Sequence, residues 1–197
     1  MLEIKRIVNS IFSSNSYLLY SDDSPEVWLI DAGDVDPICN YLALNSKKLK
    51  GVLLTHTHFD HIYGLNRLAN VFPELMVYTS YRGKEGLGSD KLNMSRYNLR
   101  PFVFRSDNVE ILQEGQEVQL WENVRLMAFE TPGHDWSALC FKVGDAVFTG
   151  DSYLPQYDLI TNFPKSNKEQ AFKSLERIKE LSVGCSLYPG HGDIVYA

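Results

Sequence analysis

Cysteine and positive charge are both scarce in this 197-residue chain. Its three cysteines form no Cys-x-x-Cys pair, and they stand at Cys39, Cys140 and Cys185. That number and spacing argue against a disulfide framework and favour the reducing cytosol. Lys and Arg total 19 against 25 Asp and Glu, which gives a formal net charge of −6. Proteins that hold polynucleotides by their phosphates are usually basic, so nucleic acid is not an expected partner.

Long apolar runs are also absent from the sequence. The first seven residues contain no apolar stretch and no small-residue cleavage site, so they do not resemble a signal peptide. No run reaches the roughly 20 apolar residues that cross a bilayer, so no membrane partner is expected. With 44% hydrophobic and 22% charged residues, the chain has the composition of a globular protein. We expect residues 1–197 to form a single cytoplasmic domain.

Strand and helix signals alternate in both halves of the sequence. Runs of β-type residues occupy 3–8, 15–20, 27–31, 51–55, 76–79, 118–120, 125–129, 139–143, 146–149, 186–188 and 194–196. Helical signals occupy 37–44, 64–71 and 167–181, and the last has apolar residues spaced by three at Phe172, Leu175, Ile178 and Leu181. This alternation predicts an α/β or αβ-sandwich domain.

Residues 80–109 do not fit that alternation. Positions 80–88 hold three glycines, which predicts no stable helix there. A connection of this length in a compact domain is usually functional or mobile, and the alternative is a solvated surface loop.

All five histidines fall at predicted strand ends or beside glycine. Three of them lie in the segment Thr-His-Thr-His-Phe-Asp-His, residues 55–61, directly after an apolar strand. His134 and His191 each follow a Pro-Gly pair, and Asp151 follows Gly150 at the end of another apolar strand. A lone surface histidine usually has no function, but this coincidence of all five favours a common site.

The spacing within the first cluster has a chemical reason. Alternate side chains of an extended segment share a face, so His56 and His58 are expected to point together. Asp60 continues that alternation, and His61 departs from it as the chain turns. One short loop can therefore supply imidazoles to one cation and a carboxylate with an imidazole to a second, each needing three or four ligands.

The three distal residues, His134, Asp151 and His191, would complete these two ligand sets. A carboxylate at position 151 suits a bridge because its two oxygens can bind two cations. Imidazole and carboxylate donors without thiolate fit Zn²⁺, and they also fit Fe or Mn.

The pattern resembles the metallo-β-lactamase-fold superfamily, in particular its glyoxalase II-like (hydroxyacylglutathione hydrolase) branch. The motifs that carry the resemblance cover almost the whole chain: Asn15-Ser16-Tyr17-Leu18, Asp31-Ala32-Gly33, residues 55–61, Thr131-Pro132-Gly133-His134, Phe148-Thr149-Gly150-Asp151 and Tyr188-Pro189-Gly190-His191-Gly192. The resemblance implies a four-layer αββα sandwich with the metal site at one edge, between two sheets. It implies two metals, most simply two Zn²⁺, with a first set of His56, His58 and His134, a second set of Asp60, His61 and His191, and Asp151 bridging.

The resemblance also implies a mechanism. Two cations share a water and lower its pKa, and the bridging hydroxide attacks an acyl or phosphoryl centre. Asp60 is expected to act as a catalytic residue that orients the hydroxide or passes on its proton. No serine or cysteine nucleophile is needed, and the sequence has no Gly-x-Ser-x-Gly motif.

Some positions depart from the pattern of that branch. An Asp at position 151 argues against a β-lactamase of the Cys-containing kind. Glyoxalase II enzymes carry a C-terminal helical domain that helps to hold glutathione, and we expect this domain to be missing because the chain ends six residues after His191. Residues 152–165 lack the glutathione-binding Lys/Tyr pattern, and Asp135-Trp136 replaces the usual Thr-Pro or Thr-Ser. Glutathione thioesters are therefore one candidate substrate class among several.

Other residues receive secondary predictions. Tyr153 lies near where related lactonases use a tyrosine as an electrophilic helper, so it is a second candidate catalytic residue. Trp136 either lines the pocket or fills the core. Lys165, Arg96 and Tyr97, in long loops, either bind an anionic or aromatic substrate or are simply solvated. Three further residues are expected to position the ligands, namely Thr55, Gly150 and Gly190.

The leading hypothesis is a binuclear metal hydrolase that acts on a small ester, thioester or lactone. The first alternative is a mononuclear-iron persulfide dioxygenase on the same scaffold, which would use fewer of the seven ligands. A nuclease or phosphodiesterase is a second alternative, disfavoured by the pI of about 5.4. A non-catalytic binding module is disfavoured because all seven ligand positions are filled. The expected partner is a small-molecule substrate, and no oligomeric state is predicted.

Overall fold

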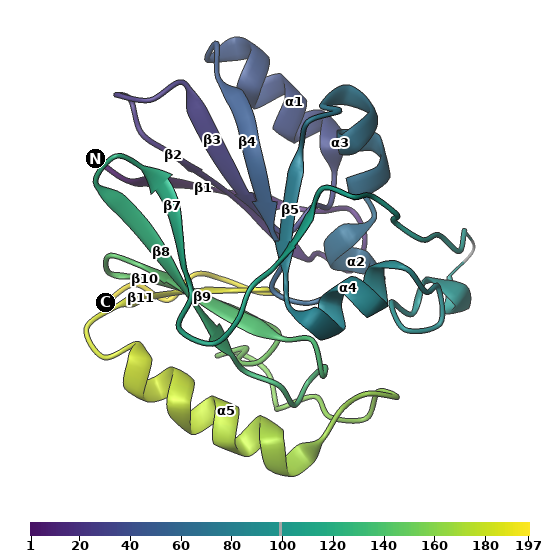
Figure 1. The fold of residues 1–197 in the computed structure, drawn as a ribbon. Coiled ribbons are helices and arrows are strands. Elements are labelled where there is room, and N and C mark those ends of the chain that lie inside the picture. The colour runs from purple at the N-terminus through teal and green to yellow at the C-terminus, as the bar shows by residue number, and fades with distance from the viewer. Residues whose placement is uncertain (99) are drawn as a thin grey trace.

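Two β-sheets lie face to face in the computed structural model, which describes residues 1–98 and 100–197 (Figure 1). The first sheet has six strands in chain order: β1 (Glu3–Val8), β2 (Asn15–Tyr20), β3 (Glu26–Ile30), β4 (Lys48–Leu53), β5 (Met76–Thr79) and β6 (Val109–Ile111). The second has the order β11-β10-β9-β8-β7, with β7 (Glu117–Trp121), β8 (Val124–Glu130), β9 (Leu139–Val143), β10 (Ala146–Gly150) and β11 (Ser186–Pro189).

Helices cover the outer faces of both sheets. The first sheet is covered by α1 (Val35–Leu44) and α3 (Leu65–Val71), and the second by α5 (Lys168–Leu181) (Figure 1). Shorter helices are α2 (Phe59–Ile62), α4 (Tyr81–Leu87) and the 3₁₀ turn η1 (Ser95–Tyr97). The expected four-layer αββα sandwich is thereby confirmed. None of the helices in the described residues has the length and apolar character needed to span a bilayer.

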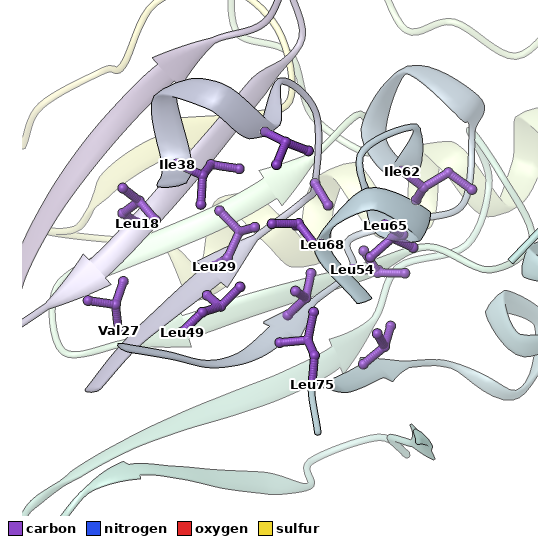
Figure 2. Packing of buried hydrophobic residues seen from close by; sticks show 14 of the residues in the cluster. Leu18, Val27, Leu29, Ile38, Leu49, Leu54, Ile62, Leu65, Leu68 and Leu75 are labelled. Carbon is purple, nitrogen blue, oxygen red and sulfur yellow. The ribbon is translucent and has the colours of Figure 1, made fainter. Parts of the chain in front are cut away.

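The strands of the first sheet are apolar on both faces because each face belongs to a different core. Leu18 and Leu29 pack against Ile38 of α1, between the sheet and its helices (Figure 2). The neighbouring Leu19 points the opposite way and packs with Phe141 of the second sheet. Burial on both faces fixes where each strand ends, and therefore where the loops beyond it begin.

One helix forms where the glycine content predicted none. Ser80 caps α4 by accepting a hydrogen bond from the backbone N–H of Gly83 (3.0 Å). Gly83 and Gly86 are both buried, and a Cβ on either would overlap a threonine hydroxyl, of Thr79 and Thr57 respectively. The glycines are therefore contact points for tight packing rather than helix breakers. Residue 99, within the 80–109 segment, lies outside the described residues.

Two further sequence expectations need correction. Residues 194–196 form no strand, since only an isolated bridge joins Val195 to Leu187. The buried face of α5 is Ala171, Ser174 and Ile178, whereas Phe172 is 51% exposed. The helix turns this face inward because Gly133 approaches the backbone of Ala171 so closely that a Cβ would overlap it.

Candidate metal centre

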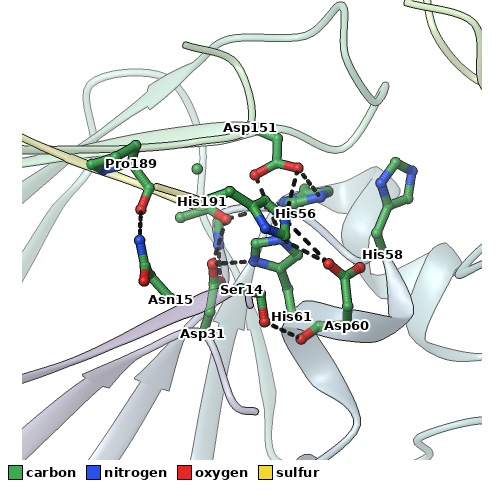
Figure 3. A network of polar contacts seen from close by, with 12 residues as sticks. Ser14, Asn15, Asp31, His56, His58, Asp60, His61, Asp151, Pro189 and His191 are labelled. Carbon is green, nitrogen blue, oxygen red and sulfur yellow. Dashed lines mark hydrogen bonds and ion pairs between the residues drawn. The ribbon is translucent and has the colours of Figure 1, made fainter. Parts of the chain in front are cut away.

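Four loops at one edge of the sandwich bring the seven predicted metal ligands together. Figure 3 labels six of them, all except His134. The loop and short helix after β4 carry residues 56–61, the β8–β9 loop carries His134, and Asp151 and His191 directly follow β10 and Gly190. Their ligand atoms lie within 4.8 Å of one another in three groups: His56, His58 and His134; His56, His61 and Asp151; and Asp60, His61 and His191.

Asp151 lies between the first and third of these groups. Its Oδ2 is 3.5 Å from Nε2 of His134 and 3.5 Å from Nε2 of His191. Its Oδ1 is 3.5 Å from Nε2 of His61. This is the placement that a carboxylate bridging two cations requires.

The ring nitrogens that face away from the centre are held by acceptors. Three rings are fixed through Nδ1: His61 by Asp31 Oδ2 (2.9 Å), His134 by the carbonyl of Ile160 (3.0 Å) and His191 by the carbonyl of Phe12 (3.1 Å). Carbonyl and carboxylate oxygens can only accept, so each Nδ1 carries a proton, and in the neutral ring each Nε2 presents a lone pair to the centre.

Asp31 orients a second ring through Thr55. The carboxylate of Asp31 accepts from the backbone N–H (2.8 Å) and the hydroxyl (2.7 Å) of Thr55. Because that hydroxyl has donated its proton, its oxygen accepts from Nδ1 of His56 at 3.2 Å. Nε2 of His56 is therefore also a free lone pair. Sequence analysis included Asp31 in a motif of the resemblance but gave it no role at the site, although a polar residue ending an apolar strand is a usable signal.

His58 differs from the other four rings because it faces the centre with Nδ1. Its Nε2 lies 3.6 Å from Oδ2 of Asp135, whose Oδ1 accepts from the backbone N–H of Ser137 (2.9 Å). Sequence reasoning treated Asp135 only as a departure from a family pattern. The structure gives it the same positioning task for His58 that Asp31 has for His61.

The donors fit a pair of cations on physical grounds. Nε2 of His61 and Nε2 of His191 approach to 3.2 Å, and Nδ1 of His58 and Nε2 of His134 approach to 3.1 Å. Two imidazole nitrogens this close repel each other unless a proton or a metal cation lies between them. In addition, Nε2 of His56 is buried with no hydrogen-bond partner. Imidazole and carboxylate groups in this arrangement match the preferences of Zn²⁺ and of Fe.

Burial and neighbouring charges set the protonation of these groups in the metal-free protein. Burial lowers the pKa of His56 well below its usual range and lowers that of His134, so both are neutral ligands. Burial alone would also lower the pKa of His61, but the carboxylates of Asp60 and Asp151 outweigh it and raise the pKa. Burial raises the pKa of Asp151, and the His61 imidazole overcomes this effect and holds the pKa well below its usual range. The carboxylates of Asp60 and Asp151 therefore stay ionised, and this negative charge favours the binding of cations.

The N-terminal hairpin anchors the last ligand. The side-chain amide of Asn15 donates to the carbonyls of Pro189 (3.0 Å) and Gly192 (2.9 Å), on either side of His191 (Figure 3). Ser14 donates to the carbonyl of Asp60 (2.8 Å). Residues 14–15, near the start of the chain, and residues 189–192, near its end, thus meet at the metal centre.

A cavity of about 480 Å³ opens onto this centre. Five of the candidate ligands and a largely apolar set of side chains line it: His58, Asp60, His134, Asp151, His191, Phe12, Phe59, Met94, Tyr97, Asn98, Leu154, Tyr157, Ile160 and Phe163. Phe163 packs edge-on against both His58 (5.2 Å) and His134 (5.5 Å) between ring centroids. Part of the apolar lining is therefore in direct contact with the first ligand group.

Of the loop residues that received secondary predictions, some lie at the cavity and others do not. Tyr97 lines the cavity, whereas Arg96 is paired with Asp90 (2.9 Å). Lys165 lies over the ring of Trp136, 4.3 Å from its centroid, and Trp136 lines a separate, smaller cavity.

Tyr153 lies elsewhere. It is not among the residues that line the cavity, where the described tyrosines are Tyr97 and Tyr157. The geometry therefore gives no support to an electrophilic role for Tyr153.

Gly190 lies where the sequence expected a positioning residue. A Cβ at Gly190 would overlap Oδ1 of Asp151, so the close approach of β11 to the bridging position needs glycine. Gly150 has a φ of +49°, and its carbonyl accepts from the backbone N–H of Gly190 (2.8 Å).

Gly86 of α4 has a comparable role that can be tested. In Gly86→Ala the new methyl group would displace Thr57, which separates His56 from His58. We expect zinc affinity to fall about 10-fold, the lower end of the effect of disturbing residues that position metal ligands. Competition with a chromophoric chelator measures this. Gly88→Ala is the matched control, since its nearest neighbours lie at 3.7 Å, and equal affinity in the two variants would refute the packing role.

Comparison with known proteins agrees with this geometry. The family model described as metallo-beta-lactamase superfamily matches residues 10–191. The chain therefore belongs to the metallo-beta-lactamase superfamily, and it stands among the metal-dependent hydrolases of that class with a His/Asp cluster as its candidate metal centre.

Particular relatives share most of the chain. A probable metallo-hydrolase of Streptococcus pyogenes serotype M6 is 30% identical, over 98% of this chain and 84% of its own length. A hydroxyacylglutathione hydrolase of Pseudoalteromonas translucida is 26% identical over 97% of this chain, and the chain spans only 65% of that enzyme. The expected likeness to the glyoxalase II branch is confirmed. The solved structure of the BLEG-1 B3 metallo-beta-lactamase superposes with a TM-score of 0.89 at 25% identity, covering 98% of this chain and 94% of its own.

Two comparisons bear on the metal. A Bacillus subtilis relative, 30% identical over 80% of this chain and 63% of its own length, is named a probable polyketide biosynthesis zinc-dependent hydrolase. TTHA1623, solved in a di-iron-bound form, shares the fold with a TM-score of 0.84 at 22% identity over 98% of this chain and 94% of its own. Zinc and iron, two of the three metals that the donor set allows, are therefore named for similar proteins.

Proposed function

We propose that this protein is a binuclear hydrolase, loaded most simply with two Zn²⁺, that cleaves a small ester, thioester or lactone. The observation that carries the proposal is the two close approaches between imidazole nitrogens, at 3.1 and 3.2 Å, that converge on Asp151. Two separate close approaches of this kind call for two cations rather than one. A mononuclear-iron dioxygenase would use only one of them.

The residues divide into two ligand sets and a bridge. His56, His58 and His134 would hold one cation, and Asp60, His61 and His191 the other, with Asp151 between them. When bound, the cations would supply Lewis acidity to the substrate carbonyl and would lower the pKa of a water between them.

Asp60 is the proposed proton acceptor. Its carboxylate lines the cavity, and one oxygen lies 3.2 Å from Nε2 of His191 and 3.4 Å from Nε2 of His61. Burial alone would raise the pKa of Asp60, but the His61 charge and the His191 contact reverse this and hold it below its usual range. A carboxylate kept ionised beside the reaction centre can orient an attacking water and take its proton.

The cavity does not favour the nuclease alternative. Among the described residues that line it, none is Lys or Arg. Beyond the metal centre, a polyanionic phosphodiester would therefore meet apolar side chains instead of cationic ones.

The metal content and the products of hydrolysis test this proposal together. Protein purified without chelators is expected to carry about two metal ions per chain by elemental analysis, in line with binuclear hydrolases generally. It is expected to hydrolyse members of a panel of uncharged esters, thioesters and lactones, and not bis-p-nitrophenyl phosphate. One iron per chain, with sulfite formed from a persulfide, would contradict the proposal and support the dioxygenase.

The variant His58→Ala tests the first ligand set independently of the second. The variant removes one imidazole from the first set without touching the second, so we expect at least one metal to be lost and the far-ultraviolet circular dichroism to stay unchanged. Hydrolysis should fall at least about 100-fold, the upper end of losses on disturbing a metal's surroundings. Asp158→Asn is the control. It removes an exposed carboxylate that follows Asp151 in the chain but lies outside the ligand cluster. Full activity and unchanged metal content in His58→Ala would defeat the assignment.

A further inference from the structure

Exposed aromatic side chains gather at the cavity. Six Phe and Tyr side chains in the described part of the chain are strongly exposed, and three of them line this one cavity: Phe12 (70%), Tyr97 (66%) and Tyr157 (56%). Exposed apolar groups that cluster in this way usually mark a binding surface. Ile160 and Phe163 continue the same wall inward to the rings of His58 and His134.

The charges around the cavity are confined to the metal ligands. Its described lining contains Asp60 and Asp151 and no Lys or Arg. The cations that sequence analysis offered for an anionic substrate are otherwise engaged, since Arg96 pairs with Asp90 and Lys165 lies over Trp136. A carboxylate on a bound substrate would lose hydration against this wall without gaining a partner.

The turn that carries Phe12 is held in an unfavourable backbone conformation. Phe12 and Ser13 both have a φ of +54°, a region that non-glycine residues rarely adopt. The carbonyl of Phe12 accepts from Nδ1 of His191, and its ring packs edge-on against Phe59 at 5.5 Å between centroids. The same strained turn therefore orients a candidate ligand and sets a phenyl group at the cavity wall.

We propose that the substrate presents an uncharged, apolar acyl group to the wall formed by Phe12, Tyr97, Tyr157, Ile160 and Phe163. This inference rests on the proposed function and deepens it by naming the substrate class. The scissile carbonyl must reach the Asp60 and Asp151 end of the cavity, and the group attached to it then lies along apolar side chains. Glutathione, with its carboxylates, is not the part of a thioester that this cavity recognises.

A homologous series of substrates tests the proposal. The zinc-loaded protein is given N-acetylcysteamine thioesters of acetate, butyrate, hexanoate and octanoate, with S-hexanoylglutathione for comparison. We expect kcat/KM to rise about fourfold for each added methylene up to hexanoate, the gain that burial of one methylene gives. Replacing N-acetylcysteamine by glutathione should change kcat/KM by less than about threefold, because no described cation in the lining is available to it.

Binding to the metal-free protein provides a readout independent of hydrolysis. Nile red, a neutral apolar fluorophore, is titrated and then displaced with N-octylacetamide. Phe12→Ser and Tyr157→Ser should each weaken the binding of N-octylacetamide about 10-fold, which is the order of loss when one aromatic contact is truncated. Both variants should also reduce the dependence of kcat/KM on acyl length. Phe172→Ser is the matched control, because Phe172 is equally exposed on α5 but lies outside the cavity, and it should behave like the parent protein.

The outcomes separate this proposal from the function it rests on. Specific binding that the cavity variants weaken, without hydrolysis of any ester, thioester or lactone, would uphold the apolar cavity and reject the hydrolase. Hydrolysis with no dependence on acyl length, or a preference of more than about 10-fold for the glutathione thioester, would overturn the substrate class and leave the hydrolase standing. Equal effects of Phe12→Ser and Phe172→Ser would likewise overturn it.

Discussion

Asp151→Asn is expected to lower hydrolysis at least about 100-fold and to reduce metal content from two ions per chain toward one. An amide offers one good donor oxygen where the carboxylate offers two, so it cannot serve both ligand groups. Its NH₂ group would also face the Nε2 atoms of His134 and His191, or that of His61, each now 3.5 Å from a carboxylate oxygen. Elemental analysis and kcat/KM on the hexanoyl thioester measure both effects.

Asp145→Asn is the control for that variant. Asp145 is an exposed residue in the turn that precedes β10, so its substitution changes the same functional group in the same hairpin without touching the centre. Parent-like activity with two bound ions in Asp151→Asn would show that Asp151 does not bridge. A loss shared by both variants would point to damage to the hairpin rather than to the metal site.

Asp31→Ala is expected to reduce the free energy of unfolding by about 3 kcal/mol, because it leaves buried donors without an acceptor. The backbone N–H and hydroxyl of Thr55 and the Nδ1–H of His61 all donate to this one carboxylate, which is 1% exposed. The rings of His56 and His61 would both lose their orientation, so zinc affinity should also fall about 10–100-fold. Denaturant unfolding of the metal-free protein and zinc competition measure these quantities separately.

Asp36→Ala provides the comparison for stability. Asp36 pairs with Arg67 at the surface, where an ion pair contributes little, so no measurable loss is expected. If Asp31→Ala were as stable as Asp36→Ala, the buried network would not hold the ligand loop. If it were destabilised with unchanged zinc affinity, Asp31 would act on the fold alone.

Much of the site could be predicted because its ligands are marked by local sequence. His56, His58 and His61 follow a buried strand, and Pro-Gly or Gly pairs mark the others. A histidine or aspartate at the end of a strand can be recognised from the sequence alone. The family resemblance then indicated how these residues divide into two ligand sets.

The residues that orient the ligands could not be assigned in the same way. Asp31 is 30 residues from His61 in the chain, and Phe12 is 179 residues from His191. Their roles depend on which acceptor lies behind which ring, and no local pattern encodes that. The helix at 81–87 was missed for a similar reason, since Gly83 and Gly86 are explained by contacts with Thr79 and Thr57 rather than by helix propensity.

The apolar wall was visible only in part. Tyr97 was a candidate from its loop, but Phe12 lies in a turn near the N-terminus, and Ile160 and Phe163 lie in the segment after Asp151. Tertiary structure alone joins these three segments around one cavity.

The hydrogen bonds from Asn15 to Pro189 and Gly192 have a consequence for the order in which the molecule assembles. They join groups 174 and 177 residues apart, so His191 reaches its place only after the last strand has docked beside the first hairpin. A nascent chain still on the ribosome can gather residues 56–61 early, yet it cannot complete the second ligand set until synthesis has passed residue 191. Stable capture of that ion would then report that the whole chain has folded.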